Sequence, residues 1–175
     1  MEGAEILKDG LTRINRSLHR SLADVSSEML SKLPTPDTNS MAWLVWHLTR
    51  VHDSHLADLI GGPELWVSEK WHEKFNMDPD DSNTGTGHTT EQVAAIKVDS
   101  SDVLLGYADV VLARTIPYLE GLKSADLDAE INEPQWDPLP TVGTRLMSVI
   151  LDNGQHAGQV AYLRGYFEGL GWQRV

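Results

Sequence analysis

Two polar residues, Asp152 and His156, interrupt an apolar pattern near the C-terminal end of the chain. The pattern advances in steps of three and four through Val149, Asp152, His156, Val160, Leu163, Phe167 and Leu170. A spacing of four places the carboxylate and the imidazole on one helix face, which the apolar neighbours predict to point at the core. Because a buried carboxylate is costly without a partner, the pattern predicts either a hydrogen-bonded Asp–His pair or a metal site.

His47 is the candidate for a third ligand. It follows the densest aromatic and apolar stretch of the chain, MAWLVW at residues 41–46, and lies one turn after Trp43. Two histidines and one carboxylate leave a position open on a divalent ion, which is typical of catalytic metal sites. We expect zinc, with nickel as the alternative. Such an ion lowers the pKa of a bound water or thiol and so provides a nucleophile at neutral pH.

Other histidines compete for a role in this site. His52 and His55 follow His47 on the same expected helix and are rival ligands by their offsets, although His52 beside Asp53 also fits a solvated helix face. His88 lies between Gly87 and Thr89 in a loop, where exposure is the default. Its role is left open by the sequence.

Four helical patterns must position these residues. Apolar residues at helical spacing mark residues 7–33, a second stretch after an N-cap at Asn39 or Ser40, a third after the acidic cluster at residues 99–102, and a fourth from Thr141. Prolines 34 and 36 end the first, and Gly61-Gly62-Pro63 ends the second. The sequence predicts an all-α fold, a four-helix bundle, with residues 1–175 forming one domain.

Two loops separate these helices. Residues 63–88 have no sustained periodicity, so we expect a long loop between the second and third long helices, with a helical turn near Trp71. Loops of this length inside a small domain are often functional. A capping box at residues 89–92 predicts a short helix. Three prolines within residues 123–140 exclude a long regular element there, so this stretch is expected to be the second loop.

The composition of the chain limits the classes of partner that we expect. The formal net charge of −12 and the absence of a dense Lys/Arg run argue against nucleic acid. With no cysteine, the chain has no thiol nucleophile of its own, so sulfur chemistry requires an outside thiol. The acidic N-terminal residues 1–5 and the lack of a long apolar run predict a cytoplasmic protein without a membrane partner. A homodimer through an exposed apolar helix face stays open.

Around the candidate ligands the chain resembles the DinB-like superfamily of metal-binding four-helix bundles. The resemblance rests on WLVWHLTR at residues 43–50 and QHAGQVAYLRG at residues 155–165. The superfamily typically holds its metal by one His on the second helix and two His four residues apart on the fourth. His47 and His156 match this pattern, whereas Asp152 replaces the third His and adds a negative charge to the centre.

Within that superfamily the chain is most similar to the actinobacterial branch that includes mycothiol S-transferases. Residues 87–89 and 136–138 also carry this resemblance. It implies that the cosubstrate mycothiol, a small sugar thiol, is activated as a metal-bound thiolate and attacks an electrophilic substrate, in detoxification. Trp46, Arg50, His52 and the 63–88 loop are then candidate walls of the thiol pocket, and no catalytic residue is expected beyond the metal ligands.

Two other functions fit the same residues. A metal-dependent isomerase or hydrolase would use the ion to activate a carbonyl or water, and it would react without any thiol. A non-catalytic metal-binding bundle would hold the ion and show no turnover.

Overall fold

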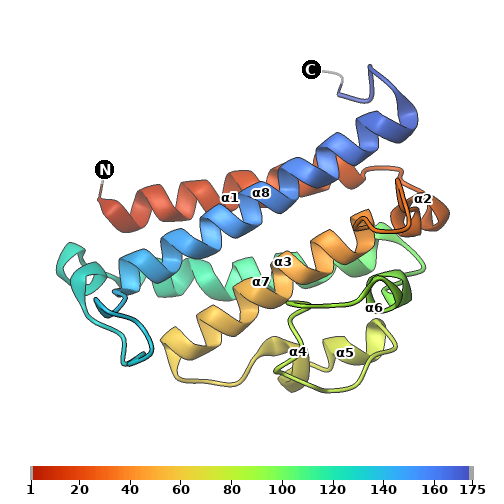
Figure 1. Cartoon of the computed structure of the whole chain (residues 1–175). Coiled ribbons are helices and arrows are strands. Elements are labelled where there is room, and N and C mark those ends of the chain that lie inside the picture. Colours follow the sequence, from red (N-terminus) through yellow and green to blue (C-terminus); the bar gives the residue numbers. More distant parts are fainter. Residues whose placement is uncertain (1, 174–175) are drawn as a thin grey trace.

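The computed structural model describes residues 2–173, and four long helices dominate it (Figure 1). These are α1 (Gly3–Leu22), α3 (Met41–Ile60), α7 (Ser101–Gly121) and α8 (Val142–Glu168). Shorter elements lie in the connections: α2 (Ser27–Ser31), α4 (Leu65–Ser68), α5 (Trp71–Lys74), α6 (Thr90–Ala95) and the 3-10 helix η1 (Ser124–Asp128). The predicted all-α four-helix bundle is therefore confirmed.

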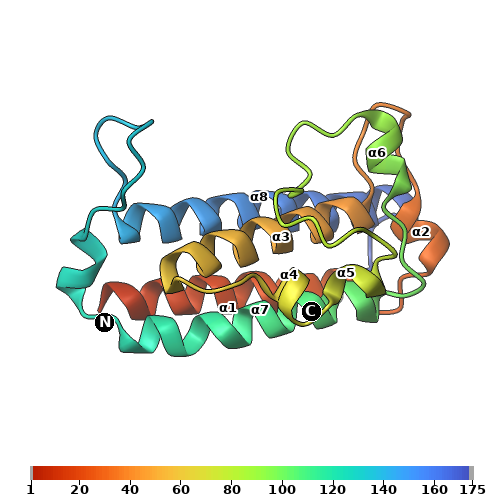
Figure 2. The same cartoon turned by 90° about the horizontal axis from the view of Figure 1, so that it is seen from below.

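The four long helices form a closed ring of neighbours. α3 packs against α8 and α7, and α1 packs against the same two helices from the opposite side. α1 runs parallel to α8 and antiparallel to α7, while α3 runs antiparallel to α8 (Figures 1 and 2). The connection between α3 and α7 crosses the whole length of the bundle and carries α4, α5 and α6, as the long predicted loop requires.

Capping chemistry fixes most of the expected boundaries. The Ser40 side chain accepts a hydrogen bond from the Trp43 backbone N–H and starts α3, and Gly61, at φ 71°, ends it in the left-handed conformation that glycine adopts freely. The predicted capping box at Thr89 opens α6, and Thr141 caps α8.

Two helix predictions were wrong. The first helix does not run through residues 7–33: α1 ends at Leu22, Asp24 takes a left-handed φ of 59°, and Ser26 caps the separate helix α2. The structure buries Leu30 and leaves Met29 half-buried, whereas a continuous helix would place Met29 on the buried face with Leu22. The apolar steps of three and four continue across the break, so this spacing could not reveal it. Leu170 lies beyond the end of α8 and is exposed.

The largest apolar cluster lies at the end of the bundle that α2, α4, α5 and α6 cover. Trp46, Trp66, Trp71 and Tyr107 pack there with Phe75, joining α3 to α7 and to the crossover. This packing makes one side of α3 a rigid support for whatever α3 presents to α8. Within residues 2–173, no helix has the length and apolar character needed to cross a membrane.

Candidate metal centre

The structure brings His47, Asp152 and His156 together. α3 supplies the first and α8 the other two, and one ligand atom from each residue lies within 4.8 Å of the others. Ligands that each lie about 2.1 Å from a zinc ion are at most about 4.2 Å apart. Side-chain adjustments of less than an ångström would therefore bring the three atoms into one coordination sphere.

Asp152 has the unsatisfied chemistry that a cation would complete. Its Oδ1 lies 3.5 Å from His156 Nε2, whereas its Oδ2 is buried and has no hydrogen-bond partner among residues 2–173. The side chains of His156 and Asp152 remain 16% and 29% exposed, so the centre is reached from solvent along α8. An orphaned carboxylate oxygen beside two imidazoles fits a divalent metal with an open coordination position.

Both imidazoles are oriented through their Nδ1 atoms. His47 Nδ1 lies 2.5 Å from the backbone carbonyl of Thr84, and His156 Nδ1 lies 2.7 Å from Gln159 Oε1. The His47 ring also stacks on Trp43, with ring centroids 4.6 Å apart. A hydrogen bond at Nδ1 leaves Nε2 as the metal ligand and fixes the ring plane, which is the usual arrangement around a metal-bound histidine.

The pKa values of the two histidines are shifted in opposite directions. Burial lowers the pKa of His47, so its neutral, ligating form is favoured. The hydrogen bond to Asp152 raises the pKa of His156. Metal binding must therefore displace a proton from His156 at mildly acidic pH, which makes the affinity of this centre for a metal increase with pH.

The 81–88 segment of the crossover is fastened to α3 by Arg50. This guanidinium is fully buried and donates to the backbone carbonyls of Asp81 (2.8 Å) and Asn83 (3.2 Å), and it pairs with Glu64. Arg50 therefore does not face an open cavity, as a wall of a thiol pocket would. Arg50 instead holds the 81–88 segment, which presents the Thr84 carbonyl to His47.

Trp46 and His88 complete this support. Trp46 is fully buried and its ring stacks on His88, with centroids 5.5 Å apart. His88 Nδ1 accepts a hydrogen bond from Trp43 Nε1 (3.1 Å), and its Nε2 donates to Asn83 Oδ1 (2.8 Å). Desolvation lowers the pKa of His88, in keeping with a neutral ring that both accepts and donates. His88 is thus an anchor of the loop, a role that its position between glycine and threonine did not reveal.

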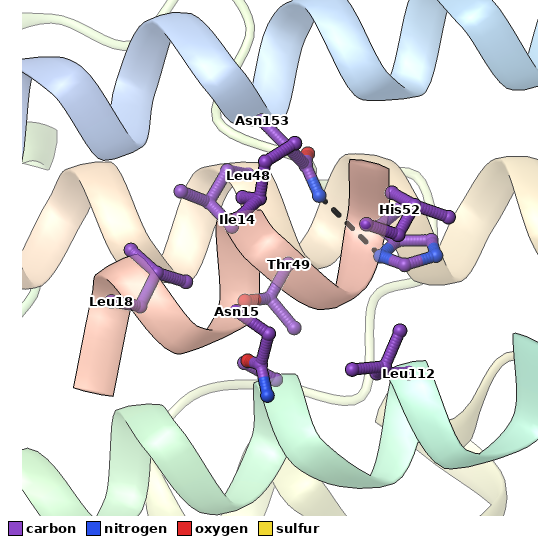
Figure 3. Close-up of a pocket in the computed structure, with 10 residues that line it drawn as sticks. Ile14, Asn15, Leu18, Leu48, Thr49, His52, Leu112 and Asn153 are labelled. Carbon is purple, nitrogen blue, oxygen red and sulfur yellow. Dashed lines mark hydrogen bonds between the residues drawn. The ribbon is translucent and has the colours of Figure 1, made fainter. Parts of the chain in front are cut away.

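His52 is placed away from the metal ligands, inside the bundle (Figure 3). Its Nε2 lies 2.9 Å from Thr115 Oγ1, and its Nδ1 faces the Asn153 amide at 3.4 Å, beside a cavity of about 10 Å³. Burial lowers the pKa of His52 to about 4. The solvated face expected for His52 and Asp53 was wrong, because both side chains are buried.

Asn153 is the buried polar residue of α8 that sequence reasoning missed. It occupies the core-facing position next to Asp152, and its Oδ1 has no hydrogen-bond partner within the described part of the chain. His55, the other rival ligand, lies two turns from His47 and contacts Arg145 at 2.6 Å. Neither His52 nor His55 joins the group of three candidate ligands.

Comparisons with known proteins identify a family and a solved structure that the chain resembles. The family model described as Mycothiol-S-transferase matches residues 6–169. A crystal structure titled as a conserved protein from Enterococcus faecalis is 30% identical in sequence and superposes with a TM-score of 0.88, covering 97% of this chain and 99% of that one. No curated protein matches the chain.

Proposed function

The chain belongs to the mycothiol-S-transferase family, and from this membership we propose that it is a metal-dependent thiol S-transferase. Its cosubstrate would be mycothiol, which it would conjugate to electrophiles in detoxification. The observation that carries the proposal is the convergence of His47, Asp152 and His156, with a buried carboxylate oxygen left unsatisfied beside them. We propose zinc as the metal, with nickel as the alternative.

The donor set defines what the centre can do. A bound divalent ion would lower the pKa of a coordinated thiol, so that its sulfur is a nucleophile at neutral pH. His47, Asp152 and His156 would hold the ion, and the Thr84 carbonyl and the Gln159 amide keep the two rings in the ligating orientation. The chain has no cysteine, so the reacting sulfur belongs to the cosubstrate.

Asp152 in place of a third histidine changes the charge of the centre. One carboxylate lowers the formal charge of a divalent site by one unit, whereas a neutral imidazole leaves it unchanged. We therefore expect a smaller depression of the thiol pKa than a three-histidine site would give. The resulting sulfur is more basic and more nucleophilic, because nucleophilicity increases with the pKa of the thiol.

The remaining support comes from how the site is enclosed. The 81–88 segment covers His47 on one side and is held there by the buried Arg50 and Trp46 and by the partly exposed His88. The side facing along α8 stays accessible at Asp152 and His156. A small thiol and a small electrophile can reach the metal from this side.

The test combines metal content with turnover. Protein purified without chelator, a His156→Ala variant and a His19→Ala control are compared by mass spectrometry for bound metal and by assay for conjugation of mycothiol to an aryl chloride, with chloride as the leaving group. His19 is a suitable control because it pairs with Asp109 on the surface, away from the site. We expect about one zinc per chain and thiol-dependent product in wild type and His19→Ala, with both lost in His156→Ala.

Other results would assign the alternatives. Turnover of a carbonyl or ester substrate that is independent of thiol would favour the isomerase or hydrolase. Bound metal without any turnover would favour a non-catalytic metal-binding bundle. Metal that is retained in His156→Ala would refute the proposed ligand set.

A further inference from the structure

We propose that a hollow between the α2–α3 connection and α8 binds the sugar end of the thiol cosubstrate. The inference rests on the proposed function, since it assigns a place to one part of that cosubstrate. The hollow has a volume of about 490 Å³ and is lined in part by Thr35, Asp37, Asn39, Gln159, Tyr162 and Tyr166. A volume of this size suits a small organic ligand.

The hollow begins beside a proposed metal ligand. Gln159, which lines it, is the residue that holds His156 Nδ1 through a 2.7 Å hydrogen bond. Tyr162 and Tyr166 follow at helical spacing, so the hollow extends from the centre along one face of α8. At a rise of about 1.5 Å per residue, Tyr162 lies about 9 Å beyond His156 along the helix axis. A thiol whose sulfur lies at the metal would extend its larger end into this space.

The chemistry of the lining fits a polyhydroxylated ring. Tyr162 and Tyr166 are 71% and 58% exposed, and their ring centroids are 6.4 Å apart. They offer apolar ring faces with a polar hydroxyl at the edge. Asp37 and the amides of Asn39 and Gln159 supply acceptors and donors for hydroxyl groups. Among the described residues that line the hollow there is no Lys or Arg, so it does not fit a phosphate or a carboxylate.

A second hollow lies on the other side of the ligands and has a different character. It is also about 490 Å³ in volume and includes Ser148, one turn before Asp152. Arg145 and Glu133 make its lining charged, and the exposed Trp136 also lines it. The hollow lined by Tyr162 and Tyr166, which has no Lys or Arg in its lining, is therefore the better match for a sugar.

The test compares mycothiol with free cysteine as the thiol. Tyr162→Ala and Asn39→Ala remove lining groups, and Trp136→Ala is the matched control that removes an exposed aromatic ring from the opposite hollow. We expect Tyr162→Ala to raise KM for mycothiol about five- to tenfold, the effect of losing one ring contact. The kcat/KM for free cysteine and the metal content should stay within twofold, since the metal ligands are unaltered.

A second measurement makes the result independent of turnover. S-methylated mycothiol keeps the sugar but cannot form a thiolate. Its binding to wild type, Tyr162→Ala and Asn39→Ala is measured by calorimetry. Wild type should bind it, and Tyr162→Ala should bind it about five- to tenfold more weakly. Binding in wild type without any transferase activity would refute the proposed function and support the sugar hollow.

Three outcomes would overturn the assignment of the hollow while leaving the transferase proposal intact. In the first, mycothiol is turned over and Tyr162→Ala and Asn39→Ala leave its KM unchanged. In the second, Trp136→Ala raises that KM, which would place the sugar in the charged hollow. A loss of activity with cysteine in Tyr162→Ala would also count against the hollow, because it would show general damage to the centre.

Discussion

Gly85 allows the 81–88 segment to lie directly against His47 of the proposed metal site, and replacing it by alanine should weaken metal binding without altering a proposed ligand. Its backbone has φ +93°, and an added Cβ would lie 2.7 Å from Trp46 Cζ3, 3.1 Å from His47 Nδ1 and 3.2 Å from Trp43 Cζ2. Trp46 is fully buried and cannot retreat. The strain must therefore be relieved by movement of the segment away from α3.

The size of the effect follows from these distances. Carbon atoms pack at about 3.5–4.0 Å, so the segment must retreat by about 1 Å. The hydrogen bond between His47 Nδ1 and the Thr84 carbonyl, now 2.5 Å, would lengthen to the limit of a useful bond. Losing such a partner of a metal ligand lowers metal affinity by about 10–100-fold, which corresponds to about 1.4–2.8 kcal/mol.

Gly87→Ala is the matched control. Gly87 lies in the same segment and also has a positive φ of 78°, but an added Cβ would meet nothing within 4 Å. Each substitution carries the conformational cost of a non-glycine residue at positive φ, about 1–2 kcal/mol. The two variants therefore share the backbone strain and differ in the clash against the site.

The assay is zinc affinity at pH 7.5, measured by competition with a chromophoric chelator after the metal has been removed. Urea unfolding of the metal-free proteins reports the backbone strain separately. We expect both variants to lose similar stability and only Gly85→Ala to lose zinc affinity. Equal zinc affinity in Gly85→Ala and Gly87→Ala would refute the idea that the Thr84 carbonyl holds His47 for the metal.

Two further predictions concern the buried polar residues behind the site. The pKa of His52 is about 4 in the folded chain and about 6.5 when unfolded, so its contribution to stability is complete above pH 6.5 and is lost as the pH falls toward 4. Between pH 7.5 and 5, urea unfolding should show wild type losing about 2 kcal/mol more than His52→Gln, and parallel curves would contradict this. Asp53 is fully buried and accepts hydrogen bonds from the backbone N–H groups of Leu65 and Trp66 and from the Tyr107 hydroxyl. Asp53→Ala should lower the free energy of unfolding by about 3–5 kcal/mol, and a loss below about 1 kcal/mol in the same assay would show that these donors find other partners.

The helices that position the ligands could be predicted because their ends carry local chemistry. Ser40, Gly61 and Thr141 set three boundaries through side-chain caps and a left-handed glycine. The break after Leu22 carries a weaker signal, since Ser26 caps α2 within a run whose apolar spacing continues. Helix starts could therefore be predicted from the local sequence more reliably than a break inside a long run of regularly spaced apolar residues.

The residues that orient the ligands were harder to predict, because they depend on contacts distant in sequence. The carbonyl of Thr84 accepts a hydrogen bond from His47, 37 positions away in sequence, and no side-chain type identifies a backbone acceptor in advance. Arg50 was expected to face a pocket, yet its buried guanidinium holds the backbone of the crossover instead. Gly85 was the available signal, since a glycine in a loop can mark a close backbone approach.

The position of Asp152 and His156 on α8 suits the two substrates of the proposed transfer. The residues of α8 that fill the bundle interior include Val149, Asn153 and Ala157, so the two ligands lie one residue, or about 100°, away from the interior row. They therefore line the seam between α3 and α8, and a hollow opens at each end of that pair of ligands. A site in the bundle centre would satisfy the same apolar spacing but would admit no ligand as large as a sugar thiol. The displacement toward the seam leaves the side chains of Asp152 and His156 partly exposed, which reduces the desolvation of Asp152 and would keep a bound ion within reach of solvent.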